Sequence, residues 1–350
     1  LQNRLIALMT FLAAIQVESG WATLERKFIH NPTSPIQNSQ KLAQTMDTRK
    51  AEADLLLKQG NQQHDTRQFQ AALQSFQQAL TIYREIGDRA GEATTLDSLG
   101  WTYRRLNQYS QALDYFQQAL AISREIGDRS TEASALNGIG LVYLTQANYP
   151  QALDYLQQAL AGFRETGDRQ SQGRVLKNIG IVYGWLGQEL KAREYGQQAL
   201  EIARETRDRL GEYFALTIIA RTYTDQNQFE PTLDYFQQAL KIAREISDRT
   251  VESTTLTNIG IIYAEWEQYP QALNYFQQAL AIVQEVGIQT DGGRIYVYIG
   301  STYAKQGEYQ QALNYYQQAL ADFREIGDLA REALILDKIA SVLDAQEQQE

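Results

Sequence analysis

Acidic and basic side chains recur together along the chain at a fixed spacing, and such charged clusters are candidates for catalytic or binding chemistry. The segment Arg-Glu-Ile-Gly-Asp-Arg at residues 124–129 returns in identical or similar form at residues 84–89, 164–169, 204–209 and 244–249. So many copies of one catalytic site are implausible. We therefore interpret these charges as solvent-exposed ion pairs in the turns between repeats, each contributing less than about 1 kcal/mol.

Residues for other catalytic constellations are scarce. The chain has no cysteine and two histidines, His30 and His64, which lie in different segments. Thiol nucleophiles, thiolate metal sites and disulfides are therefore excluded, and histidine-based metal or triad chemistry is not expected. The formal charge is -10, from 42 acidic and 32 basic side chains. This balance argues against nucleic acid as a partner, because phosphate binding needs a basic surface. The sequence predicts no enzyme activity and no cofactor.

The elements that carry these charges are internal repeats. The tetrapeptide Gln-Gln-Ala-Leu occurs seven times at a constant spacing of 40 residues, ending at Leu80, Leu120, Leu160, Leu200, Leu240, Leu280 and Leu320. A constant period of this length is typical of a stacked repeat array. In such an array, function lies along an extended surface and not in one motif.

Each repeat contains two helical segments. In residues 90–106 and again in residues 110–126, the apolar side chains fall on one helical face. Gly127 is suited to end the second helix, because glycine adopts the left-handed conformation at little cost. Asp128 can then cap the next helix through its carboxylate. Gly100 recurs at equivalent positions in most repeats, which favours close packing of helices.

Seven positions carry a family resemblance: Leu96, Leu99, Gly100, Tyr103, Ala112, Phe116 and Ala119. Together they resemble the tetratricopeptide repeat, whose usual period is 34 residues. Six extra residues fall in the segment 124–129, and such long repeats are similar to those of kinesin light chain and of cyanobacterial multi-repeat proteins, which often precede a CHAT peptidase domain. The resemblance covers about residues 50–346. It implies an all-α fold, a right-handed superhelical α-solenoid of antiparallel helix pairs, and binding to other proteins.

The sequence before the repeats divides into two parts. Residues 1–22, with Arg4 before a short apolar run, are predicted to be a signal peptide, which places the protein in the periplasm or outside the cell. If this segment is instead a helix that packs on the array, the protein is cytoplasmic. Residues 23–49 are predicted to be a polar linker. The array then occupies residues 50–350, as seven repeats and a final unpaired helix near 329–345, with no membrane span in the mature chain.

By the same resemblance, the first helices of the repeats line a concave groove. The groove-facing positions hold seven bases against three acids. Arginine binds carboxylates through two hydrogen bonds, and asparagine can bind both backbone groups of an extended peptide. We therefore expect the groove to bind an acidic or extended protein segment. The candidate ligand-binding residues are Trp101, Arg104, Arg105, Arg174, Lys177, Asn178, Trp185, Arg221 and Asn258.

Two functions remain open from the sequence. The first is a non-enzymatic scaffold for protein–protein interaction. The second is the sensing or regulatory arm of a larger enzyme, a CHAT-type peptidase, whose catalytic domain would follow residue 350. A carboxylate clamp of the kind found in chaperone-binding relatives is matched only in part, by Lys177 and Asn178, so its specificity is not carried over.

Departures from the repeat pattern give two further expectations. Gly196 stands where other repeats have phenylalanine, and we expect Trp185 or Tyr195 to fill the space. In the last helix, the apolar residues Leu334, Ile335 and Val342 belong to a broad arc that we expect to be uncovered, and thus able to mediate self-association.

Overall fold

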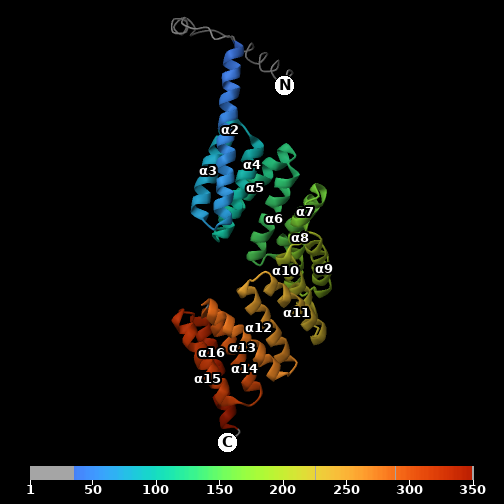
Figure 1. The fold of residues 1–350 in the computed structure, drawn as a ribbon, viewed down its shortest axis with the longest axis vertical. Coiled ribbons are helices and arrows are strands. Elements are labelled where there is room, and N and C mark those ends of the chain that lie inside the picture. The colour runs from blue at the N-terminus through green and yellow to red at the C-terminus, as the bar shows by residue number, and fades with distance from the viewer. Residues whose placement is uncertain (1–34, 225, 288, 349–350) are drawn as a thin grey trace.

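The computed structural model describes residues 35–224, 226–287 and 289–348, and within them every regular element is an α-helix. Helices run antiparallel in consecutive pairs, and the pairs follow one another along the length of the molecule (Figure 1). This arrangement confirms the predicted all-α solenoid. The helices are α2 (Pro35–Asp65), α3 (Phe69–Ile86), α4 (Arg89–Arg105), α5 (Tyr109–Ile126), α6 (Arg129–Thr145), α7 (Tyr149–Thr166), α8 (Arg169–Trp185), α9 (Glu189–Glu205), α10 (Arg209–Thr224), α11 (Phe229–Glu245), α12 (Arg249–Glu265), α13 (Tyr269–Val286), α14 (Gln289–Lys305), α15 (Tyr309–Glu325) and α16 (Leu329–Glu347).

The predicted polar linker is wrong over much of its length, because α2 begins at Pro35 and not near residue 50. Proline is tolerated in the first turn of a helix, where its missing N–H has no partner to lose. The residues that follow are mostly good helix formers, without a further proline. Once the second half of α2 packs on α3, the helix extends towards Pro35 at little cost. The predicted signal peptide lies outside the described residues.

The turns between repeats follow the predicted capping chemistry. Gly127 ends α5 in the left-handed conformation, with φ of 73°. Asp128 then caps α6, and its carboxylate accepts the backbone N–H groups of Ser130 and Thr131, each at 3.1 Å. The same aspartate cap begins α4, α8, α12 and α16. These observations confirm the roles expected for Gly127 and Asp128.

Close packing within a repeat depends on a glycine beneath an aromatic ring. A Cβ atom on Gly100 would lie 2.6 Å from the ring of Phe116, so no larger residue fits there without a shift. Beside this contact, Tyr103 stacks on Tyr115 with ring centroids 5.1 Å apart. Equivalent tyrosine pairs stack in the following repeats. In the second repeat, the second helix is therefore fixed on the first at two points.

In the fourth repeat, the space left by the missing phenylalanine is not filled by the residues that we expected. Trp185 is 58 % exposed and Tyr195 stacks on Tyr183, so neither fills the space at Gly196. The space is taken instead by α10, because a Cβ atom on Gly196 would lie 3.0 Å from Ile219 and 3.2 Å from Ile218. The next repeat thus packs more deeply on α9 than a phenylalanine would allow.

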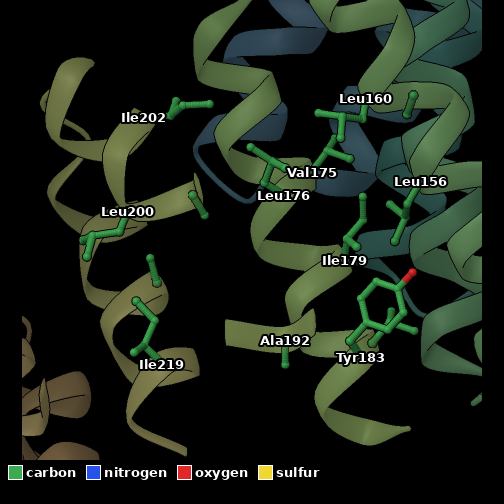
Figure 2. Packing of buried hydrophobic residues seen from close by; sticks show 14 of the residues in the cluster. Leu156, Leu160, Val175, Leu176, Ile179, Tyr183, Ala192, Leu200, Ile202 and Ile219 are labelled. Atoms are coloured by element: carbon green, nitrogen blue, oxygen red, sulfur yellow. The ribbon is translucent and has the colours of Figure 1, made fainter. Parts of the chain in front are cut away.

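The apolar core continues without a break through this region. Figure 2 shows Val175, Leu176 and Ile179 of α8 gathered beside Leu156 and Leu160 of α7. These five side chains are almost fully buried. The fourth repeat is therefore held by the same apolar layer as its neighbours, despite the change at the glycine.

Ion pairs join the repeats at the turns as expected, with arginines that are about half exposed, but the glutamate that they share is more buried than the sequence suggested. Glu132 of α6 is only 9 % exposed, and its carboxylate accepts Arg124 Nε at 2.8 Å and Arg129 Nη1 at 2.7 Å. Arg124 belongs to the preceding repeat, so the pair crosses the junction. Burial opposes the charge of Glu132, but the two arginines outweigh it and lower the pKa of its carboxyl. The same buried glutamate recurs as Glu92, Glu212 and Glu252.

We call this series of buried glutamates and their arginines the Arg–Glu–Arg spine. Its second arginine continues within the repeat, as Arg89 does towards Glu125 at 2.6 Å. The fourth repeat has Gln172 at the glutamate position, where its amide donates to the backbone carbonyl of Phe163 at 2.8 Å. The seventh repeat has Gly292 there. The spine therefore changes composition at two junctions.

Helix α16 is better covered than expected. Ile335 and Val342 are buried against α15, so the prediction that they are uncovered is wrong. They face the preceding helix, whereas Leu334, Leu336 and Leu343 on other sides of α16 remain roughly half exposed. The apolar arc of this helix is thus wider than the face that packs on α15.

Candidate functional site

The first helices of repeats two to five enclose one large hollow, which we call the central cavity. Its volume is about 550 Å³, within the range of ligand-binding pockets. Side chains from α4, α6, α8 and α10 line it, and the turn before α10 closes one side. The main lining residues are Trp101, Arg104, Ser134, Asn137, Leu141, Arg174, Lys177, Asn178, Asp208, Leu210 and Phe214.

Two cations of the central cavity rest on aromatic rings. Lys177 Nζ lies 4.9 Å from the ring centroid of Phe214, and the guanidinium carbon of Arg104 lies 5.2 Å from that of Trp101. Trp101 is itself fixed, because its Nε1 donates to Ser134 Oγ at 3.2 Å. Cation–π contacts hold a positive group in place without neutralising it. The aromatic rings therefore hold the positive charges of Lys177 and Arg104 in place, and these charges remain available to an anionic ligand.

None of the three bases of the central cavity, Arg104, Arg174 and Lys177, makes an ion pair within the described residues. The turn arginines differ, since most of them bind a glutamate of the spine. Burial lowers the pKa of the Lys177 ammonium, and the nearby Arg174 lowers it further. The charge on Lys177 is thus destabilised in the free protein, which an anionic ligand would reverse.

Polar atoms without partners also face the central cavity. Asn178 is 6 % exposed, and its side-chain amide takes part in none of the hydrogen bonds among the described residues. Arg104 Nε and Asn137 Oδ1 are likewise buried without a hydrogen-bond partner. Buried polar groups are nearly always satisfied in folded proteins. The residues that line the hollow thus include polar groups that the protein itself does not pair.

Asp97 lies behind Ser134 at the edge of this site. Its Oδ2 accepts Ser134 Oγ at 2.7 Å, while Oδ1 is buried without a partner. Burial raises the pKa of the Asp97 carboxyl to about 7, and the hydrogen bond from Ser134 only partly opposes this. Below pH 7, this group therefore carries less than half of the negative charge that would offset the three bases.

The raised pKa gives a testable pH dependence. Because folded Asp97 holds its proton more tightly than the unfolded chain does, stability falls as pH rises from about 4 to about 7. We expect Asp97→Asn to stabilise the second and third repeats by about 2–4 kcal/mol at pH 8 and to have almost no effect at pH 4. Urea unfolding at both pH values measures this. Asp114→Asn, at an exposed position, is the control, and an equal effect of Asp97→Asn at both pH values would contradict the assignment.

The structure brings five of the predicted ligand-binding residues together and separates the other four. Trp101, Arg104, Arg174, Lys177 and Asn178 all line the central cavity. The other four lie elsewhere, so the predicted site is not one continuous patch.

The four separated residues occupy three different places. Arg221 lies over the ring of Trp185, 5.4 Å from its centroid, at a small hollow between the ends of α8 and α10. Asn258 lines another small hollow on α12 and α14. Arg105 is exposed and lies 5.9 Å from the ring centroid of Phe69, outside the central cavity.

Sequence reasoning missed Phe214 and Ser134 as site residues. A signal was present, because Ser134, Arg174 and Phe214 occupy one groove-facing position in three successive repeats. Only Arg174 was predicted from this series, because it is the charged member. An aromatic residue at a position otherwise occupied by polar side chains also marks a departure from the repeat.

Comparison with known proteins agrees with this architecture. The profile of the tetratricopeptide repeat family matches residues 51–125, 131–205, 213–285 and 293–350. A repeat solenoid with a lined groove is the class that the fold and site define. The chain belongs to the tetratricopeptide repeat family, and its repeats indicate a protein-interaction scaffold. Among curated protein sequences, none matches the chain significantly.

Solved structures share the fold at low sequence identity. The apo form of RapI is 18 % identical with a TM-score of 0.62, over 79 % of this chain and 99 % of that one. A STAND signal transduction ATPase with a tetratricopeptide repeat sensor, from Pyrococcus horikoshii, is 17 % identical with a TM-score of 0.65, over 89 % of this chain and 52 % of that one. A Rap protein complexed with Competence and Sporulation Factor is 20 % identical with a TM-score of 0.59, over 85 % of this chain and 87 % of that one.

Within the described residues, no helix has both the length and the apolar character needed to cross a membrane.

Proposed function

We propose that this chain is a non-enzymatic scaffold that binds an acidic, extended segment of a partner protein in the central cavity. One observation carries the proposal: three bases without ion pairs line a hollow that also holds unsatisfied amide groups. The bases attract carboxylates, and Asn178 can bind the backbone of the segment. Trp101 and Phe214 offer apolar contacts on either side.

The solved relatives support this use of the fold without defining the ligand. A Rap protein of similar fold was solved in complex with Competence and Sporulation Factor. Repeat arrays of this kind therefore accommodate a bound factor. Charge steering would add to the affinity here, because several bases that face one hollow raise the local potential. Binding is then fast and weakens with added salt.

The test compares two charge-reversed variants of the same net charge. The groove variant is Arg174→Glu with Lys177→Glu, and the control is Arg164→Glu with Lys241→Glu, two exposed bases on the second helices α7 and α11. The probe is a fluorescent decapeptide library with Asp or Glu at every second position. We expect the groove variant to lose at least a hundredfold in affinity, since each arginine or lysine paired with a carboxylate contributes about 1.5–3 kcal/mol. Loss of binding in the control alone would show that the binding site lies on the second helices and not in the central cavity.

Self-association through α16 is a second proposal, which now rests on Leu334, Leu336 and Leu343, each roughly half exposed. Exposed apolar patches of this kind mark interfaces. We expect the native chain to form dimers at high concentration, and we expect Leu334→Glu with Leu343→Lys to abolish them. Sedimentation velocity of both proteins measures this. A native chain that stays monomeric at the highest concentration tested would exclude the interface.

A further inference from the structure

The three bases of the central cavity converge on one place although they come from distant parts of the chain. Arg104 lies on α4, two repeats before Arg174 and Lys177 on α8. Both arginines nevertheless act on Lys177, and their positive charges each lower the pKa of its ammonium, after the larger effect of burial. Side chains from α4 and α8 thus lie within electrostatic reach of each other across the hollow.

Little negative charge opposes them. Among the described residues that line the central cavity, Asp208 is the one acid. Its Oδ1 already accepts the backbone N–H of Gly211 at 2.8 Å, at the start of α10. The neighbouring Asp97 is buried, and its raised pKa keeps it largely protonated below pH 7. The charges of the lining side chains therefore sum to about two positive charges in excess, concentrated on one hollow.

A single carboxylate would leave part of this excess uncompensated, whereas a compact dianion would match it. A phosphate monoester carries about -1.5 to -2 charges at pH 7 and presents three acceptor oxygens from one group. Arginine pairs with such a group through two parallel hydrogen bonds. The side-chain amide of Asn178, which makes no hydrogen bond among the described residues, supplies a further donor at the same hollow.

We propose that the central cavity is a receptor for a phosphate monoester carried on a serine or threonine side chain of the bound segment, held by Arg104, Arg174 and Lys177 with Asn178 as a neutral donor. This inference rests on the proposed function, because it names the group by which the acidic segment is recognised. The volume of about 550 Å³ accommodates a phosphorylated side chain together with its flanking backbone.

The experiment uses the full chain and three decapeptide libraries with identical randomised flanks. Their central residue is phosphoserine, glutamate or serine, and affinities are measured by fluorescence anisotropy at pH 7.5, where the phosphate is mostly dianionic. We expect the phosphoserine library to bind at least tenfold more tightly than the glutamate library. Lys177→Met should remove most of that preference, while Lys241→Met should leave it unchanged. Free O-phosphoserine serves as a competitor, to separate a phosphorylated side chain from a small soluble phosphate.

Each result has a defined meaning. If the phosphoserine and glutamate libraries bind equally and the groove variant loses both, the acidic-segment proposal stands and the phosphate inference is overturned. If the groove variant binds every library as the native chain does, both proposals fall. If free O-phosphoserine binds as tightly as the phosphorylated library, the cavity takes a small phosphate and the side-chain inference is overturned. Competition only at much higher concentration supports it.

Discussion

Replacing Arg124 and Arg129 together with methionine is expected to destabilise the junction between the second and third repeats by more than the loss of a fully exposed ion pair would. Both arginines bind the carboxylate of Glu132, which is only 9 % exposed. Without them, a buried negative charge has no partner, and removing one side of a buried pair is far more costly than removing a surface pair. Hydrogen exchange of α5 and α6 is the suitable measurement, because repeat arrays open locally.

The chain supplies its own control for this effect. The fourth repeat carries Gln172 in place of the glutamate, so Arg169→Met should change stability little, as its partners there are Glu205 and a neutral amide. Adding Glu132→Gln to the double variant should restore most of the lost protection, because the charge is then gone. The difference in stability between the native chain and the double variant should also narrow as pH falls from neutral, because buried Glu132 without its arginines takes up a proton above its ordinary pKa, whereas the arginines keep the native carboxyl ionised to lower pH. Equal protection in the native and double-variant proteins would show that the spine contributes no more than surface pairs do.

Lys177→Met is expected to stabilise the free protein while weakening binding of an acidic segment about 10- to 100-fold. Burial and the adjacent Arg174 lower the pKa of Lys177, so at neutral pH its charge opposes folding. A folded-state pKa below the unfolded value means that this penalty is present at neutral pH and fades as pH rises towards 10.5. Methionine keeps the apolar contact with the ring of Phe214 and removes the charge.

The two effects of this substitution must appear together for the interpretation to hold. Thermal unfolding and anisotropy with the acidic library measure them on the same preparation. Lys241→Met on α11, at an exposed position, should alter neither quantity. If the variant is less stable than the native chain, Lys177 is a structural residue and not a ligand-binding residue.

The sequence predicts the fold well because the same local pattern recurs in every repeat. The 40-residue period, the glycine of the first helix and the Gly127–Asp128 turn all refer to contacts within a repeat or to its neighbour. Errors arose where structure depends on less local effects. Helix α2 extends to Pro35 because packing further along the chain nucleates it. The gap at Gly196 is filled from α10, which sequence position alone does not reveal.

The site was less predictable for a geometric reason. Equivalent positions fall on the same side of their helices, but neighbouring residues do not, so Arg104 enters the central cavity while Arg105 lies outside it. How far apart two repeats lie across the groove depends on the curvature of the whole array, which no motif encodes. Hence Arg104 and Lys177 line the same cavity, whereas Asn258 lines a separate hollow.

The constant spacing of the Arg–Glu–Arg spine has an evolutionary consequence. Since each repeat carries half of the contact with the next one, as Arg124 does for Glu132, a whole unit can be duplicated or deleted and the new neighbours still match. Unequal recombination between such similar segments would thus yield longer or shorter arrays that fold. The units with Gln172 and Gly292 lack the matching half. Lineages that gain or lose units should therefore do so most freely among the glutamate-bearing repeats, and should retain these two junctions as fixed landmarks.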